Sequence, residues 1–141
     1  MNKIAVVFWS GTGNTESMAE YVAKGVKEAG AEVTIYSSAE FNMDALNQYD
    51  AVAFGCPSMG DEVLEESEFE PMFSECKPGL KGKKIALFGS YGWGDGEWMR
   101  NWEEDCRSLG AVLVIDSIIC NETPDQDAQN ACIDLGKALA S

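Results

Sequence analysis

Residues 3–15 read KIAVVFWSGTGNT and set a pattern that the rest of the sequence repeats. Residues 3–9 form a short apolar run rich in β-branched side chains, which is typical of a strand buried on both faces of a parallel sheet. Residues 10–15 are small and polar and interrupt that run. Apolar residues then recur at helical spacing until Gly30 ends the pattern: Met18, Val22, Val26 and Ala29. The opening of the chain therefore predicts a strand, a glycine-rich turn and a helix.

The same alternation continues to the end of the chain. Further strands are expected at 32–36, 51–56, 84–90 and 111–119, and helices near 63–76, 97–109 and 126–140. Pro71 suits the first turn of its helix. Strands that alternate with helices predict parallel strands covered on both faces. We therefore expect one α/β domain over residues 1–141, built as a doubly wound, five-stranded parallel sheet.

The charge of the chain restricts its partners. The 141 residues include 24 Asp and Glu against 10 Lys and Arg, a formal net charge of −14, and no histidine. Nucleic acids and anionic membranes are bound through basic surfaces, so this charge argues against both and favours a basic macromolecular partner. Without an imidazole base the chain cannot carry Ser-His-Asp or Cys-His catalysis, nor a histidine metal ligand.

The cysteines point to a reducing compartment. They stand at positions 56, 76, 106, 120 and 132, and the closest two are 12 residues apart. This spacing contains no C-x-x-C pair and disfavours an iron–sulfur cluster. The odd count and the absence of a signal peptide predict reduced thiols and a cytoplasmic protein. No apolar run approaches the roughly 20 residues that a membrane span needs.

The loop before the first helix has the composition of a phosphate-binding turn: Ser10, Gly11, Thr12, Gly13, Asn14 and Thr15. Helix N-termini present unpaired N–H groups, and glycines let the backbone wrap an anion closely. The loop lacks the lysine of a Walker motif, and Glu16 stands where a dinucleotide fingerprint needs its third glycine. It therefore favours a terminal phosphate held by hydrogen bonds. The alternative is a structural helix start capped by Asn14 or Thr12.

Two further loops follow the third and fourth predicted strands. One contains Ser58, Met59, Gly60 and Glu62, and the other reads SYGWGDG over residues 90–96. Trp93 can stack on one face of a flat aromatic ligand and the polarizable Met59 thioether can pack on the other. Alternatively, Met59 is a core side chain and Trp93 covers the sheet edge. Since parallel strands end at a common edge, all three loops are expected around one ligand.

Three segments are specific when taken together: WSGTGNT at 9–15, MGDEVLEESEFEP at 59–71 and FGSYGWGDG at 88–96. Through them the sequence resembles the short-chain flavodoxins of the clostridial type, over essentially the whole chain. The resemblance implies a flavodoxin-like fold with strand order 2-1-3-4-5 and a non-covalently bound flavin mononucleotide (FMN). It also implies a monomeric, low-potential electron carrier that shuttles between flavin semiquinone and hydroquinone, in place of or beside ferredoxin.

The resemblance assigns roles to individual residues. The 10–15 loop matches the phosphate loop, and Met59 and Trp93 match the residues that sandwich the isoalloxazine ring. Gly60 matches the glycine whose carbonyl accepts from flavin N5–H after reduction, and Glu62 matches the acceptor of N3–H. The other matching cofactor-binding residues are Pro57, Ser58, Ser90, Tyr91, Gly92, Gly94 and Asn121. Pro57 stands where some relatives carry a phosphate-contacting serine, and Ser58 is the candidate replacement.

Acidic residues are concentrated beside the proposed flavin loops. No Lys or Arg lies between Glu28 and Cys76, where 12 of the 24 acids stand. This field is expected to disfavour an anionic reduced flavin, so neutralising Glu62, Glu65 and Glu66 should raise the second redox potential. It is also expected to steer basic-surfaced reductases and oxidoreductases that also use ferredoxin. The alternative is a solvated helix face that serves solubility.

Two other functions are possible on such a fold. An FMN-dependent NAD(P)H quinone or azo reductase would need a substrate pocket beside the flavin, usually built by insertions. A phospho-accepting signalling domain would need an aspartate at the end of the third strand, where Cys56 stands. The sequence favours the electron carrier over both.

Overall fold

The computed structural model describes residues 2–60, 62–92 and 94–141. Strands and helices alternate along the chain as the periodicity predicts. The elements are β1 Lys3–Phe8, α1 Asn14–Glu28, β2 Glu32–Ser37, α2 Met43–Leu46, β3 Ala51–Gly55, α3 Phe69–Cys76, β4 Lys84–Tyr91, α4 Glu97–Ser108, β5 Val112–Leu113, β6 Ile118–Asn121 and α5 Gln126–Ala140. Short 3-10 turns at Ser38–Glu40 and Lys77–Gly79 complete the set.

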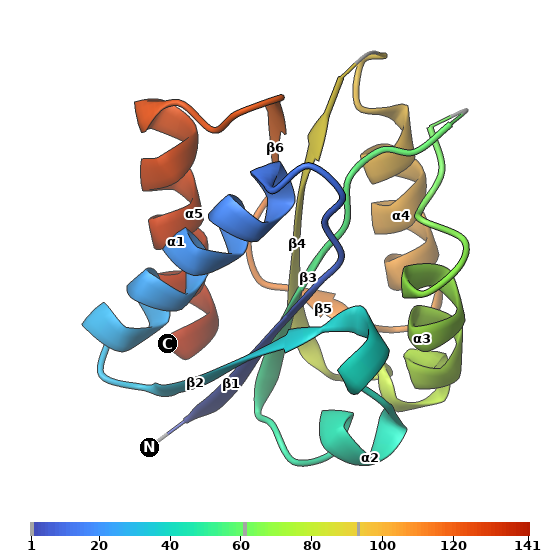
Figure 1. Ribbon diagram of the computed structural model, residues 1–141. Helices are drawn as coiled ribbons and strands as arrows, with labels where there is room; N and C mark the ends of the chain where they lie inside the picture. Colours follow the sequence, from blue (N-terminus) through green and yellow to red (C-terminus); the bar gives the residue numbers. More distant parts are fainter. Residues whose placement is uncertain (1, 61, 93) are drawn as a thin grey trace.

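The strands form one parallel sheet in the order β2-β1-β3-β4-β5, and β6 also pairs with β4. The predicted order is confirmed. Because all these pairings are parallel, β1, β3, β4 and β6 end at the same edge of the sheet, which is uppermost in Figure 1. The loops that follow these strands therefore gather at this edge.

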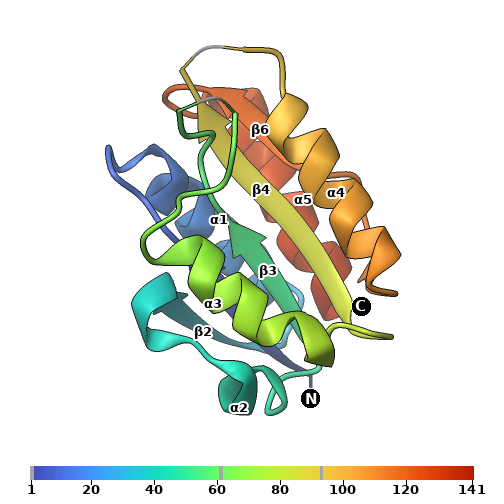
Figure 2. The same cartoon turned by 90° about the vertical axis from the view of Figure 1, so that its right-hand side faces the viewer.

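Two helical layers cover the sheet. Helices α1 and α5 lie on one face, and α3 and α4 lie on the other, as Figures 1 and 2 show from two directions. The sheet has a hydrophobic core on each face, and the side chains of β1 alternate between them. Ile4 and Val6 pack with α1 and α5, whereas Ala5 and Val7 belong to the core under α3 and α4. None of the helices in the described part of the chain combines the length and hydropathy that a membrane crossing needs.

The predicted fifth strand, 111–119, is wrong as a single element. Two short strands replace it: β5 pairs with the start of β4, and β6 pairs with its end. Between them Asp116 and Ser117 leave the ladder, and Ser117 Oγ donates to Glu103 Oε2 at 2.7 Å. Aspartate is disfavoured in strands, and the Ser117 hydroxyl is held by Glu103 of α4, which together explain the interruption. The sheet consequently has six strands rather than five.

The helix expected near 63–76 begins only at Phe69. Val63 instead pairs with Met59, and the buried Glu65 carboxylate accepts the amide of Phe69 at 2.9 Å. This carboxylate therefore fixes where α3 starts. Pro71 consequently falls in the first turn, as predicted, where its missing N–H leaves no hydrogen bond unmade.

Candidate functional site

A cavity of about 370 Å³ opens at the carboxyl edge of the sheet. It lies beside the start of α1 and takes its walls from the loops that follow β1, β3, β4 and β6. Its lining residues are Trp9, Gly11, Thr12, Asn14, Pro57, Ser58, Met59, Ser90, Tyr91, Gly92, Glu122 and Thr123. The structure thus brings the three loops singled out in the sequence around one space. Its volume falls in the range of small-molecule and cofactor sites.

In the first loop, Gly13 occupies the position directly before α1. Gly13 has a φ of 94°, and its amide donates to Ser10 Oγ at 3.0 Å. Helix α1 has no side-chain cap among the described residues, so neither Asn14 nor Thr12 caps it as the structural alternative expected. The first amides of the helix and its positive dipole end are therefore available to an anion.

Thr15 and Ser90 connect the first loop to the end of β4. Both side chains are buried, and their hydroxyl oxygens lie 2.9 Å apart. The Ser90 amide also approaches Thr15 Oγ1 at 3.4 Å. Ser90 borders the cavity, whereas Thr15, Ser10 and Gly13 are not among its lining residues. This buried pair holds the phosphate-type loop in register with β4.

The second loop is a short hairpin. The amide of Met59 donates to the carbonyl of Val63 at 2.9 Å, and the Val63 amide returns the bond at 3.0 Å. Met59 is half-buried and lines the cavity, so it is not the core side chain of the alternative interpretation. Gly60 lies at the exposed turn with a φ of 51°, a conformation that glycine adopts at little cost.

The third loop approaches the second one through Glu62. A Cβ on Gly94 would come within 2.5 Å of the Glu62 carboxyl carbon, and Glu62 Oε1 accepts the Glu97 amide at 3.1 Å. The carboxylate therefore sits at the N-terminus of α4. Gly60, Glu62 and Gly94 lie outside the cavity lining, and Trp93 lies outside the described residues.

The loop after β6 completes the wall with residues that the sequence alone did not assign. Glu122 has a φ of 58°, its amide donates to the Tyr91 carbonyl at 2.8 Å, and it lines the cavity with Thr123. Asn121 is exposed and does not line the cavity, although its Nδ2 reaches the same carbonyl at 3.4 Å. The sequence feature that could have identified Glu122 and Thr123 is that their loop follows a parallel strand and therefore lies at the carboxyl edge of the sheet. Trp9, the last residue of the apolar run at 3–9, also lines the cavity.

The cavity is lined without cations. None of the described lining residues is Lys or Arg, and Glu122 is the one acid among them. Beside the cavity, burial raises the pKa of the Cys56 thiol to about 12, so this cysteine stays protonated and inert as a nucleophile. Burial of Glu65 opposes its ionisation, but hydrogen bonds from Ser67, Phe69 and Glu68 outweigh burial and lower its pKa to about 2.

These surroundings fit a flat, phosphorylated cofactor such as FMN. The hydroxyls of Thr12, Ser58 and Ser90, the Asn14 side-chain amide and the uncapped start of α1 offer the donors that a phosphate needs. Met59, Tyr91 and Trp9 give the remainder of the wall an apolar and aromatic character. The absence of a lysine from the described lining agrees with a ligand phosphate held by neutral donors.

Comparisons with known proteins agree with this site. The family model described as Flavodoxin matches residues 6–136. The chain is 51% identical to the flavodoxin of Clostridium beijerinckii, covering 96% of this chain and 98% of that protein. It is 47% identical to the flavodoxin of Megasphaera elsdenii, covering 97% and 98%. The solution structure of the two-electron reduced Megasphaera elsdenii flavodoxin superposes with a TM-score of 0.90 at 46% identity, covering 97% of this chain and 98% of that chain. The chain therefore belongs to the flavodoxin family and is an FMN-binding electron-transfer protein.

Proposed function

We propose that this chain carries single electrons at low potential with FMN held non-covalently in the cavity at the carboxyl edge. One observation supports this most directly: the start of α1, the Met59 hairpin and the loop after β4 meet around a single space of about 370 Å³. A phosphate needs hydrogen-bond donors and an aromatic ring needs apolar walls, and the lining of this cavity contains both.

The phosphate end of the proposed site is the 10–15 loop. Thr12 and Asn14 border the cavity, and Gly11 lies close enough to Trp9 that a Cβ there would be 3.0 Å from its ring. Donation by amides and hydroxyls would replace the cation that many phosphate sites use. Ser58 also borders the cavity and is the proposed donor in place of the serine that Pro57 replaces.

The ring end of the proposed site comprises Met59, Trp93, Tyr91 and Gly92. Gly60, Glu62 and Gly94 are proposed to contact the edge of the ring. Their loops lie next to the cavity, and Gly60 has the backbone freedom that a change in peptide orientation requires. Asn121, Glu122 and Thr123 are proposed to flank the ribityl chain.

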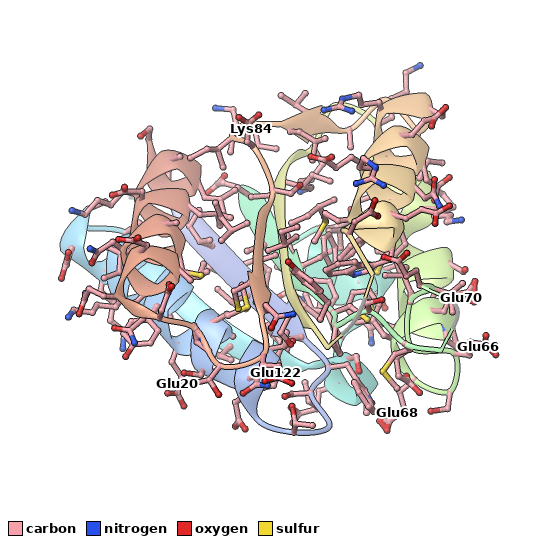
Figure 3. The ribbon with its side chains drawn as sticks, turned by 90° about the horizontal axis from the view of Figure 1, so that it is seen from above. Glu20, Glu66, Glu68, Glu70, Lys84 and Glu122 are labelled. Atoms are coloured by element: carbon pink, nitrogen blue, oxygen red, sulfur yellow. The ribbon has the colours of Figure 1, made fainter. Side chains whose placement is uncertain are left out.

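When bound, FMN accepts two electrons in successive one-electron steps. The protein is proposed to lower the second potential, because apolar walls and nearby carboxylates both disfavour added negative charge. Glu66, Glu68 and Glu70 gather on one side of this end of the molecule, and Glu122 lies on the other (Figure 3). Glu65 does not belong to this exposed set, since its carboxylate is buried against the start of α3.

The partners are proposed to be basic-surfaced redox proteins that also serve ferredoxin. The net charge of −14 and the acidic residues beside the proposed ring site support this. Association rates with such partners should fall as ionic strength rises, because salt screens exposed charges beyond roughly 10 Å at 0.1 M.

We also propose that residues 1–141 act as one monomeric domain in the cytoplasm. Asn2 Nδ2 donates to the Ala140 carbonyl at 2.9 Å, so the start of β1 and the end of α5 lie side by side. All five cysteines are free thiols and four are buried, which suits a reducing compartment.

The test is an FMN titration followed by stepwise reduction with dithionite. We expect a yellow complex whose visible spectrum passes through two separate one-electron steps. A protein that does not take up FMN, or that gains both electrons in one step, would contradict the proposal. In a second arm, the holoprotein is mixed with NADPH and a quinone without a reductase. The carrier should be inactive there, whereas turnover would favour the reductase alternative.

A further inference from the structure

The loop over 57–64, which contributes one wall of the cofactor cavity, is fixed to the sheet where it begins. The Cys56 amide donates to the Phe88 carbonyl at 3.1 Å, and the Ser58 amide donates to the Ser90 carbonyl at 3.0 Å. Both acceptors belong to β4. The entry side of this loop is therefore held by the backbone hydrogen bonds that also join β3 to β4.

The exit side of the loop leaves the sheet and is held by Glu65. This residue is 6% exposed, although Glu66, Ser67 and Glu68, which follow it, are all exposed. The Glu65 amide donates to Cys56 Sγ at 3.4 Å. This contact closes the base of the loop, because it joins the exit side to the residue that precedes the entry side.

The Glu65 carboxylate accepts donors on both of its oxygens. Oε1 accepts the amides of Glu68 and Phe69 at 2.8 and 2.9 Å. Oε2 accepts the Ser67 amide at 2.9 Å and also the Ser67 hydroxyl. A carboxylate only accepts, and its two oxygens can take about four hydrogen bonds. Glutamate therefore matches this set of donors, whereas glutamine would turn an N–H group toward one pair of them.

Glu65 thus connects the base of the loop to the start of α3, while the tip stays free. Its amide contacts Cys56, and its carboxylate holds the first turn of α3. Between base and tip, Met59 and Val63 exchange backbone hydrogen bonds of 2.9 and 3.0 Å. Gly60 lies beyond them, at the exposed turn. A tip on a fixed base meets a ligand at a lower cost in conformational entropy than a tip on a mobile base.

We propose that Glu65 is a positioning residue for the flavin: its hydrogen bonds fix the base of the 57–64 loop, so that Gly60 meets the edge of the ring in one place. The inference rests on the proposed function, because it requires that Gly60 contacts the ring. Glu65 is buried and does not line the cavity. It therefore acts through the loop rather than as a ligand of the cofactor or as an exposed charge.

The potentials of the FMN-loaded protein separate positioning from charge. Glu65→Gln and Glu65→Asp both break the network, the first by replacing an acceptor with a donor and the second by shortening the side chain. Only Glu65→Gln removes the charge. Both variants should lower the equilibrium constant of the first one-electron step at least threefold, which is about 28 mV at roughly 59 mV per tenfold change. High salt should not abolish the shift, because salt screens exposed charges and not a buried network.

Two other variants are matched controls. Glu66→Gln removes a charge from the adjacent exposed residue and should change the second potential but not the first. Gly25→Ala should lower stability in the other helical layer, because a Cβ there would lie 2.0 Å from the Ile133 carbonyl oxygen, and should leave both potentials in place. An unchanged first potential in both Glu65 variants overturns the proposal. So does an equal fall of the first potential in either control.

Amide hydrogen exchange of Met59 and Val63 tests the loop independently of the potentials. With and without FMN, both amides should exchange at least threefold faster in the Glu65 variants than in the unsubstituted protein. Exchange that the Glu65 substitutions leave unchanged contradicts the proposed anchor.

The two proposals fail in different ways. A protein that binds FMN with separated potentials, but does not respond to the Glu65 substitutions, refutes only the positioning role. A protein that binds no FMN refutes the proposed function, even where exchange shows that Glu65 holds the loop.

Discussion

The hydroxyl oxygens of Thr15 and Ser90 lie 2.9 Å apart and are buried, although 75 positions separate the two residues in the chain. One residue belongs to the first turn of α1 and the other to the end of β4. This single contact joins two of the loops that surround the cavity. It also gives each buried hydroxyl a partner, which burial requires.

Thr15→Val tests that contact. Valine keeps the shape of threonine but removes the hydroxyl, so Ser90 Oγ is left buried without its partner. The free energy of unfolding should fall by about 1–2 kcal/mol, measured by urea denaturation, and the FMN dissociation constant should rise. Thr15→Ser retains the hydroxyl and is the control. Equal losses in the two variants would show that the methyl group, not the hydrogen bond, matters.

Gly60→Ala tests the backbone freedom of the second loop. The φ of 51° at Gly60 should cost alanine about 1 kcal/mol of stability. If Gly60 reorients on reduction as proposed, the first one-electron potential should also fall, by about 59 mV for each tenfold loss of stabilisation. Gly82→Ala is the matched control, because Gly82 has a φ of 75° and equally open space around it. Both variants should lose stability, and only Gly60→Ala should change the potential in spectroelectrochemical titration.

Glu65 predicts a specific acid sensitivity. Its pKa is lowered to about 2 in the folded protein, from an ordinary value of 4.5, because hydrogen bonds to the carboxylate outweigh its burial. A depressed folded pKa contributes stability that is present above pH 4.5 and lost as the pH falls toward 2. We expect about 2 kcal/mol from this group after allowing for solvent screening. Glu65→Gln should remove that contribution at pH 7 and flatten the stability curve below pH 4.5, measured by denaturation at each pH. An unchanged slope in the variant would assign the acid sensitivity to other groups.

Glu62→Gln tests the field at the proposed flavin edge. Glutamine keeps an acceptor for the Glu97 amide but removes the charge, so the second one-electron potential should rise by tens of millivolts. A rise of about 59 mV corresponds to a tenfold change in the equilibrium constant of that one-electron step. The effect should shrink as salt is added. Glu20→Gln on the exposed face of α1 should shift the potential less. Identical shifts in both variants would attribute the effect to net charge alone. The carboxylate of Glu65 is unsuitable for this test, because neutralising it also disturbs the start of α3.

Gly25→Ala tests the contact between α1 and α5. Alanine normally stabilises the middle of a helix, but a Cβ on Gly25 would lie 2.0 Å from the Ile133 carbonyl oxygen. The helices would have to separate, so we expect a loss of about 3 kcal/mol in the free energy of unfolding. Gly30→Ala, at a φ of 86° with open space, should lose only about 1 kcal/mol. A stabilised Gly25→Ala protein would show that the two helices can adjust freely.

Much of the architecture could be predicted from the chain because it depends on local periodicity. The buried run at 3–9, the helical spacing from Met18 to Ala29 and the strand–helix alternation specify elements one at a time, since each pattern arises within one strand or helix. The same logic located the three loops of the cavity, because parallel strands must end at one edge. The resemblance to flavodoxins supplied the strand order, which the sheet confirms.

Packing between distant segments decided the rest. The break between β5 and β6, the capping of α3 by Glu65 and the contact of Glu62 with the start of α4 each depend on partners that no local pattern reveals. Trp9, Glu122 and Thr123 joined the cavity for the same reason. Periodicity specifies which face of an element is apolar, but the neighbour that a side chain meets is set by three-dimensional packing. The paired hydroxyls of Thr15 and Ser90 therefore emerge only when the helices close over the sheet.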